Sequence, residues 1–139
     1  MRPALFAAIA FLAQPVLADD APVDAGSQTA IKSVIQQQLD AIKAGDATTA
    51  ESFASQGIRD KFPDPTAFLG MVRQAYGALV APKSTHFGDL SQTPLGLVQK
   101  LTVVGSDGTV WTAAYTMTLL DGQWRISGCY MLKSEAVDA

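Results

Sequence analysis

The sequence is poor in the residues from which metal centres and covalent cross-links are built. Its 139 residues contain one cysteine and one histidine, and only 17% of them are charged. A single cysteine excludes an internal disulfide framework and a cysteine-based zinc site, because both need several sulfur atoms. A single histidine also supplies too few ligands for a conventional metal centre. We therefore expect neither a metal nor another cofactor.

The balance of charge argues against nucleic acid as a partner. Lys and Arg together number 10 and Asp and Glu number 13, which gives a formal net charge of −3. Proteins that bind the phosphate backbone carry clustered positive charge, and this sequence has no basic stretch interleaved with aromatic residues. Glycine-rich phosphate loops, nucleophile elbows and HExxH runs are absent as well. The motifs therefore indicate no particular reaction.

The first 18 residues have the order of a secretory signal peptide. Arg2 precedes ten uninterrupted apolar residues at 4–13, and Val16 and Ala18 occupy the −3 and −1 positions of a cut after Ala18. Ten residues extend over about 15 Å as a helix, which is half the hydrocarbon core of a bilayer and too short for a stable span. We expect an exported protein, periplasmic or secreted, with no membrane insertion after cleavage.

The rest of the chain is expected to form one domain with short flanks. Residues 19–28 are acidic and small, contain Pro and Gly, and lack an apolar period, which predicts a disordered leader. Residues 134–139 are similar and predict a flexible tail. Residues 29–133 have the length of a single domain. Loss of residues 1–18 would leave 9 basic and 13 acidic side chains, a net charge of −4.

Apolar residues at the start of the domain recur with the spacing of a helix. The pattern predicts a helix over 29–43, with Ser27 as its N-cap and Gly45 as its left-handed stop. Gln38 falls within the apolar stripe, so its amide needs a hydrogen-bond partner inside the protein. The residues that make the stripe are Ile31, Val34, Ile35, Leu39 and Ile42.

Further helices are expected before the chain turns to strands. A second helix is predicted to start at Asp46 or at Thr48, because Thr48-x-x-Glu51 matches a capping box. A short helical turn is expected at 58–62. An Asp followed by a Pro in the first helical position predicts another helix over 64–77.

After Pro82 the apolar period changes from 3.6 to 2, which predicts strands. Tight turns containing Gly separate the last three of them. Helices followed by an antiparallel meander, in about a hundred residues, define an α+β layer architecture. The strands are predicted at 84–90, 95–104, 109–120 and 123–132.

Strict alternation assigns the faces of the last two strands. Trp111, Ala113, Tyr115 and Met117 share one face of the third strand. In the fourth strand, alternation places Cys129 on the face opposite Trp124 and Ile126. Gly128 predicts a bulge or bend, which a sheet needs if it is to curl over a helix. We interpret Cys129 as a buried, inert thiol, since free cysteine is among the most buried residue types.

Several segments, in their order and spacing, carry a family resemblance. They are Ile31–Ala41, Phe53-Ala54-Ser55 with Ile58-Arg59-x-x-Phe62, Phe68-Leu69-x-Met71-Val72, and Trp124–Cys129. Together they resemble an uncharacterised bacterial family, domain of unknown function 4864, which is similar to members of the nuclear transport factor 2-like superfamily. The resemblance implies N-terminal helices packed on a curved antiparallel four-stranded sheet, forming a cone with an internal cavity. It implies no activity, because that superfamily includes isomerases, cyclases, dehydratases, transport adaptors and binding modules.

Aromatic and polar side chains supply the candidates for a ligand site in such a cavity. Aromatic residues would line an apolar pocket, and a few polar side chains would orient a polar group of the ligand. Aromatic residues at helical and strand spacing more usually belong to the core. The candidates are Gln38, Phe53, Phe68, Arg73, Tyr76, His86, Trp111 and Tyr115.

Two residues are candidates for a catalytic base. His86, on the first strand, is the only imidazole, and Asp40 lies on the first helix. Asp40 is one helical step off the apolar stripe, so the pattern favours a solvated position. An exposed or half-buried position is also the more usual one for a strand histidine. No second carboxylate has a register that would pair with Asp40.

Three functions remain open at this point. The first is an exported, non-catalytic module that binds a small apolar or amphipathic ligand, or a peptide, in its cavity. The second is a small enzyme of the isomerase or cyclase type that uses His86 or Asp40 as its base. The third, implied by the superfamily resemblance, is an interaction module that forms a homodimer through its open sheet face. Outward positions of both candidate bases would deprive the enzyme of its acid–base groups.

Overall fold

Helices precede the sheet along the chain, as the change of period predicts. The computed structural model describes residues 23–134, and the expected signal peptide at 1–18 lies outside them. The helices are α1 (Ala25–Ala44), α2 (Ala47–Ser52), α3 (Gln56–Lys61) and α4 (Pro65–Ala75), followed by the 3-10 turn η2 (Gly77–Leu79). The strands are β1 (Ser84–Thr93), β2 (Gly96–Val104), β3 (Val110–Leu120) and β4 (Gln123–Lys133).

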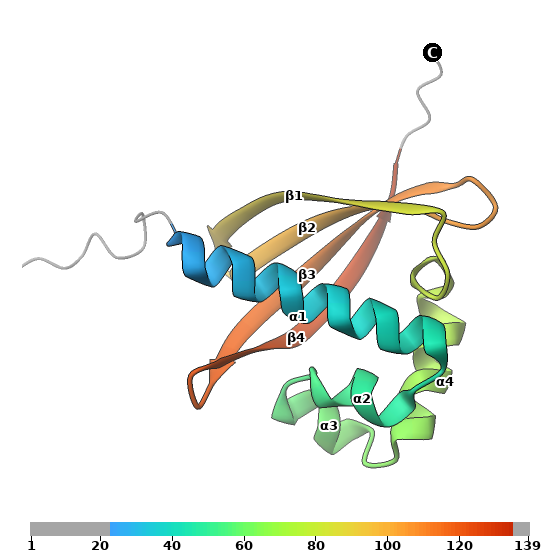
Figure 1. Ribbon diagram of the computed structural model, residues 1–139, viewed down its shortest axis with the longest axis horizontal. Coiled ribbons are helices and arrows are strands. Elements are labelled where there is room, and N and C mark those ends of the chain that lie inside the picture. The colour runs from blue at the N-terminus through green and yellow to red at the C-terminus, as the bar shows by residue number, and fades with distance from the viewer. Residues whose placement is uncertain (1–22, 135–139) are drawn as a thin grey trace, which may run out of the picture.

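The four strands form an antiparallel meander in the order β1-β2-β3-β4, which confirms the α+β fold. Helix α1 lies across one face of the sheet. Helices α2, α3 and α4 lie near the C-terminal end of α1, on the β4 side of the sheet (Figure 1). The turn between β3 and β4 has positive φ at both Asp121 (52°) and Gly122 (78°), as a tight hairpin turn requires. Within residues 23–134 no helix is long and apolar enough to cross a membrane.

Carboxylate caps fix the starts of α1, α2 and α4. Helix α1 begins at Ala25 rather than at Thr29, because the Asp24 carboxylate accepts a hydrogen bond of 2.7 Å from the backbone N–H of Ser27. Residues 25–28, assigned above to the leader, are therefore helical, and Ser27 is not the cap. Asp46 caps α2 in the same way, and Asp64 with Pro65 starts α4 as predicted.

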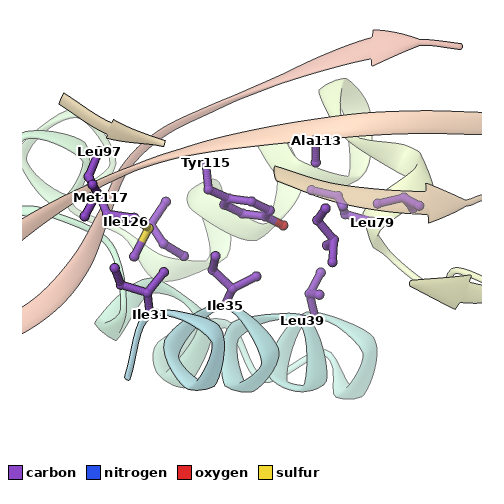
Figure 2. Packing of buried hydrophobic residues seen from close by; sticks show 11 residues of the cluster. Ile31, Ile35, Leu39, Leu79, Leu97, Ala113, Tyr115, Met117 and Ile126 are labelled. Atoms are coloured by element: carbon purple, nitrogen blue, oxygen red, sulfur yellow. The ribbon is translucent and has the colours of Figure 1, made fainter. Parts of the chain in front are cut away.

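The main hydrophobic core lies between α1 and the sheet (Figure 2). The apolar stripe of α1 supplies Ile31, Ile35 and Leu39, as the helical spacing predicts. The predicted inner face of β3 is also confirmed, since Ala113, Tyr115 and Met117 are buried there with Trp111 packed at the margin. The sheet and α1 thus bury each other's apolar faces.

A second, smaller core lies at the C-terminal end of α1. It joins α1 to α2 and α4 through Ala41, Ile42, Ala50, Phe68, Leu69 and Val72. Tyr76 packs against both cores from the end of α4. The protein therefore has two adjacent hydrophobic clusters, and the space between them is available for a pocket.

A bulge in β4 changes which side chains face inward. Thr116 pairs with Gly128 but Met117 pairs with Ile126, so Ser127 is an extra residue in β4. Beyond the bulge the alternation is reversed: Cys129 packs against the main core, whereas Tyr130 is 45% exposed and Leu132 is 53% exposed. The prediction of a bulge is confirmed. The prediction that Cys129 faces away from Ile126 is wrong, because strict alternation ignores the extra residue.

A second bulge interrupts β1. The register shifts between Phe87 and Leu90, which leaves Gly88 and Asp89 outside the regular ladder with β2. The fully buried Gln99 of β2 compensates, because its amide nitrogen donates hydrogen bonds of 2.9 Å to the carbonyl oxygens of Gly88 and Lys100. A side chain therefore replaces part of the missing backbone ladder.

The chain before α3 adds a short bridge to the free edge of β4. The backbone N–H of Ser55 donates to the carbonyl of Ile126, and the N–H of Ile126 donates to the carbonyl of Phe53, both at 2.8 Å. Ala54 pairs with Ile126 in parallel orientation. This bridge attaches the helical layer to the sheet just before the bulge.

The bulge leaves no room for a side chain at Gly128, and this can be tested. A Cβ atom at this position would lie 2.9 Å from Oγ1 of Thr116, closer than real Cβ contacts allow. We expect Gly128→Ala to lower the free energy of unfolding by about 1–3 kcal/mol through overpacking. Chemical denaturation of the variant and the wild type measures the difference.

Thr116→Ala is combined with Gly128→Ala, because it removes the oxygen atom that the new Cβ would meet. The double variant should lose less stability than the sum of the two single changes, by about 1 kcal/mol. Gly70→Ala on α4 is the control: nothing lies within 4 Å of its added Cβ. It should raise stability by about 0.5–1 kcal/mol. Simple additivity in the double variant would contradict the proposed clash.

Candidate ligand-binding pocket

A pocket of about 370 Å³ lies between the two hydrophobic cores. The pocket is lined by the end of α1, by α3 and α4, and by the edge of β4. Leu79, Tyr115 and Ile126 of the main core form part of its wall, and Ile42, Phe68 and Val72 of the second core form another part. This volume falls at the lower end of the range typical of small-molecule sites, about 300–1,000 Å³.

Apolar side chains make most of the pocket wall. The Phe62 and Phe68 rings meet edge to face, with centroids 6.1 Å apart and an interplanar angle of 71°. This is a favourable arrangement for two aromatic rings. Ile58 and Met71 extend the apolar wall from α3 and α4. The pocket would therefore favour an apolar ligand body.

Gln38 brings an amide from α1 into this apolar surrounding. Its side chain is 5% exposed, and its nitrogen donates a hydrogen bond of 3.0 Å to the carbonyl of Ala50. The position of Gln38 within the apolar stripe predicted an interior partner, and Ala50 is that partner. The bond fixes the amide group in place. Its oxygen accepts no hydrogen bond from residues 23–134.

Tyr115 is the second polar side chain on the wall. Figure 2 shows its ring above Ile35, with the hydroxyl directed toward the end of the core that contains Leu39 and Leu79. The residue is 1% exposed, and its hydroxyl has no hydrogen-bond partner within the described part of the chain. Burial raises the pKa of Tyr115 well above its usual range, so the phenol keeps its proton. An unpartnered buried hydroxyl costs about 1–3 kcal/mol of stability.

Cys129 enters the pocket because of the bulge in β4. The Tyr76 hydroxyl donates a hydrogen bond of 2.9 Å to the Cys129 carbonyl, which holds this part of the strand edge against α4. Burial raises the pKa of the Cys129 thiol to about 12. The thiol is therefore protonated at neutral pH and adds no charge to the pocket. Burial also raises the pKa of Tyr76.

The structure brings together half of the predicted ligand-site residues. Gln38, Phe68, Tyr76 and Tyr115 line the same pocket. The other four lie elsewhere: Phe53 lines a separate hollow beside Trp124, Arg73 and His86 are exposed, and Trp111 packs at the margin of the main core.

Neither candidate for a catalytic base lies in this pocket. His86 is exposed on β1, and Asp40 is exposed on α1, where it accepts a hydrogen bond of 3.0 Å from the amide nitrogen of Gln36. The enzyme alternative thus loses the two groups on which it was based. Within residues 23–134, no three His, Cys, Asp or Glu residues are placed so that they could hold a metal ion.

Several residues of the pocket were not predicted from the sequence. Cys129 was assigned to the wrong face, although Gly128 had already signalled the bulge that turns it inward. Ile58, Phe62 and Met71 were not among the candidates either. Their apolar spacing in α3 and α4 was visible, but it did not reveal that both helices line one pocket.

A comparison with protein-family models places the chain in a family. The model described as Domain of unknown function (DUF4864) matches residues 24–139, which is most of the sequence. The chain therefore belongs to the DUF4864 family. A search of the curated proteins gives no match.

The raised pKa of Cys129 predicts slow reaction with iodoacetamide. With a pKa of about 12, about one thiol in ten thousand is ionised at pH 8, so alkylation should be roughly three orders of magnitude slower than for free cysteine. Because pH remains below the pKa, the rate should increase about tenfold per unit from pH 7 to pH 10. Mass spectrometry of quenched samples measures it. A plateau near pH 9 would mean that the thiol is neither buried nor perturbed.

Proposed function

We propose that this protein is an exported module that binds a small, mainly apolar molecule in the pocket between its two cores. The observation that carries the proposal is the pocket itself. It is mostly apolar, yet two buried polar side chains, Gln38 and Tyr115, lie on its wall. An apolar cavity with a few fixed polar groups is the usual form of a small-molecule site.

The size of the pocket supports a small molecule over a peptide. A volume of about 370 Å³ accommodates a compact ligand, whereas peptides bind along open grooves or sheet edges. The β4 edge beside the pocket is already occupied by the hydrogen bonds from Phe53–Ser55 and from Tyr76. Export to the periplasm or outside the cell, expected from residues 1–18, is part of the same proposal.

Membership of the nuclear transport factor 2-like superfamily is also part of the proposal. Helices on one face of an open antiparallel sheet, with a pocket enclosed at one end, are compatible with that cone-shaped fold. Fold alone does not determine what a cavity binds. The proposed binding therefore rests on the pocket residues.

Filling the pocket is expected to abolish the binding of toluene, a compact apolar test compound. Met71→Trp places a larger side chain on the pocket wall, whereas Gln74→Trp adds the same group at an exposed site on α4. Toluene should shift the amide NMR signals of pocket residues in the wild type and in the Gln74→Trp variant. These shifts should be absent in the Met71→Trp variant.

Circular dichroism checks that the filled variant is folded. Ile58→Trp, at a wall residue on α3, is the second filling variant if Met71→Trp disturbs α4. Toluene binding that survives in a folded, filled variant would refute this location of the site. No toluene binding to the wild type would count against the proposed function.

A second candidate function, homodimer formation, is favoured by the outer face of the sheet. Tyr130 and Leu132 follow each other on this face of β4, and Leu132 pairs with Thr112 of β3. Both side chains are exposed, as is that of Val110 two residues before Thr112. Neighbouring exposed apolar side chains on a sheet are typical of a contact surface.

Leu132→Lys tests the dimer directly. A charge in the middle of an apolar contact should lower the dimerisation constant at least about tenfold. Sedimentation velocity over a range of concentrations measures the association, and Lys83→Glu, at an exposed position before β1, is the control. A wild type that sediments as a monomer at all concentrations would rule the dimer out.

A further inference from the structure

The pocket contains no charge that a ligand could neutralise in its interior. Among its lining residues in the described chain, Lys61 is the only charged one, and its side chain is exposed. The two phenols and the thiol remain protonated, because burial raises the pKa of Tyr76, Tyr115 and Cys129. A carboxylate or ammonium group inside this pocket would lose its hydration without gaining a partner.

Two polar side chains on the pocket wall have hydrogen-bonding groups that the protein itself does not use. Tyr115 has an O–H donor without a partner among residues 23–134, and its oxygen is fully buried, so a ligand would reach it by displacing neighbouring side chains of the pocket wall. Gln38 uses its amide nitrogen on the Ala50 carbonyl, which leaves the amide oxygen as a fixed acceptor. The Tyr76 hydroxyl, by contrast, is already bonded to the strand edge. Tyr115 and Gln38 are thus the two groups that remain for a ligand.

We infer that the pocket selects a neutral ligand whose apolar body carries a hydroxyl or amide group, held by Tyr115 as donor and Gln38 as acceptor. This inference rests on the proposed function and adds to it the charge and the polar group of the ligand. A hydroxyl or an amide both accepts and donates a hydrogen bond, which matches the donor–acceptor pair. Binding would satisfy polar groups that the protein alone leaves without partners.

Three test compounds of similar size separate the possible results. Toluene has no polar group, benzyl alcohol has a hydroxyl, and benzoate carries a negative charge. Their dissociation constants are measured by NMR titration on the wild type, on Tyr115→Phe and on Tyr130→Phe. Tyr130 lies on the exposed outer face, so its variant is the matched control.

Tyr115→Phe should weaken benzyl alcohol about 5- to 30-fold, the effect of one lost buried hydrogen bond. It should leave toluene affinity unchanged within about twofold, because the aromatic wall is preserved. Tyr130→Phe should change neither affinity. On the wild type, benzoate should bind at least about tenfold more weakly than benzyl alcohol, because its charge would be buried without a partner.

A purely structural role of the hydroxyl has a different signature. Because the Tyr115 hydroxyl is unpartnered in the free protein, its removal should leave the melting temperature unchanged or higher. If Tyr115→Phe does not fold, the ring Cζ resonance of wild-type Tyr115 is the second measurement. It should shift when benzyl alcohol binds and stay in place when toluene binds.

The possible failures are distinguishable. Toluene binding with equal losses of toluene and benzyl alcohol in Tyr115→Phe would overturn the inference and leave the proposed function standing. The same holds for benzoate binding as tightly as benzyl alcohol, or for a Tyr115 Cζ resonance that benzyl alcohol leaves in place. Absence of binding for all three compounds would overturn both.

Discussion

The backbone hydrogen bonds between Ile126 and the Phe53–Ser55 segment join the sheet to the helical layer. Helix α2 is also held to α1 by the second core and by the Gln38–Ala50 hydrogen bond, but neither of these contacts involves the sheet. The N–H and the carbonyl of Ile126 are both used, so the contact is fixed in direction and register. The rest of the pocket is arranged around this contact. The Ile126 side chain lies on the pocket wall, and Ile58 follows three residues after Ser55.

The β4 bulge shapes the part of the pocket wall next to this attachment. The extra residue, Ser127, follows Ile126 directly and reverses the faces of the residues after it. The reversal directs Cys129 into the pocket and exposes Tyr130 and Leu132 on the opposite face. One inserted residue therefore shapes both the pocket wall and the outer surface of the sheet.

The elements of the fold were largely predictable, because each depends on neighbours in the sequence. The apolar stripe from Ile31 to Ile42 and the alternation around Tyr115 identified the buried face of α1 and of β3. The predicted start of α1 was wrong because two side chains could cap the helix, the Asp24 carboxylate and the Ser27 hydroxyl. Asp24 is the cap, and it accepts its hydrogen bond from the backbone N–H of Ser27. The pocket was only partly predictable. It depends on the packing of α3 and α4 against β4, which connects residues that are distant in the sequence and leaves no local period.

The polar residues proposed for the site show the same limit of prediction from the sequence. Gln38 was recognisable because an amide within an apolar stripe must find a partner, and Tyr115 because it shares a face with Ala113 and Met117. The local pattern did not exclude His86 and Arg73, because their side chains can also form hydrogen bonds with a ligand. Only the three-dimensional arrangement shows that the first two are buried beside a cavity and the other two are exposed.

The Gly88–Asp89 bulge has a consequence for the opposite edge of the sheet. β1 is an edge strand of ten residues, and a long, regular edge is a template on which strands of other molecules can add and aggregate. The bulge breaks the regular spacing of its free N–H and carbonyl groups near the middle of the strand. Asp89 adds an exposed acidic residue at the same point. The irregularity that Gln99 stabilises from within therefore protects the protein from edge-to-edge assembly.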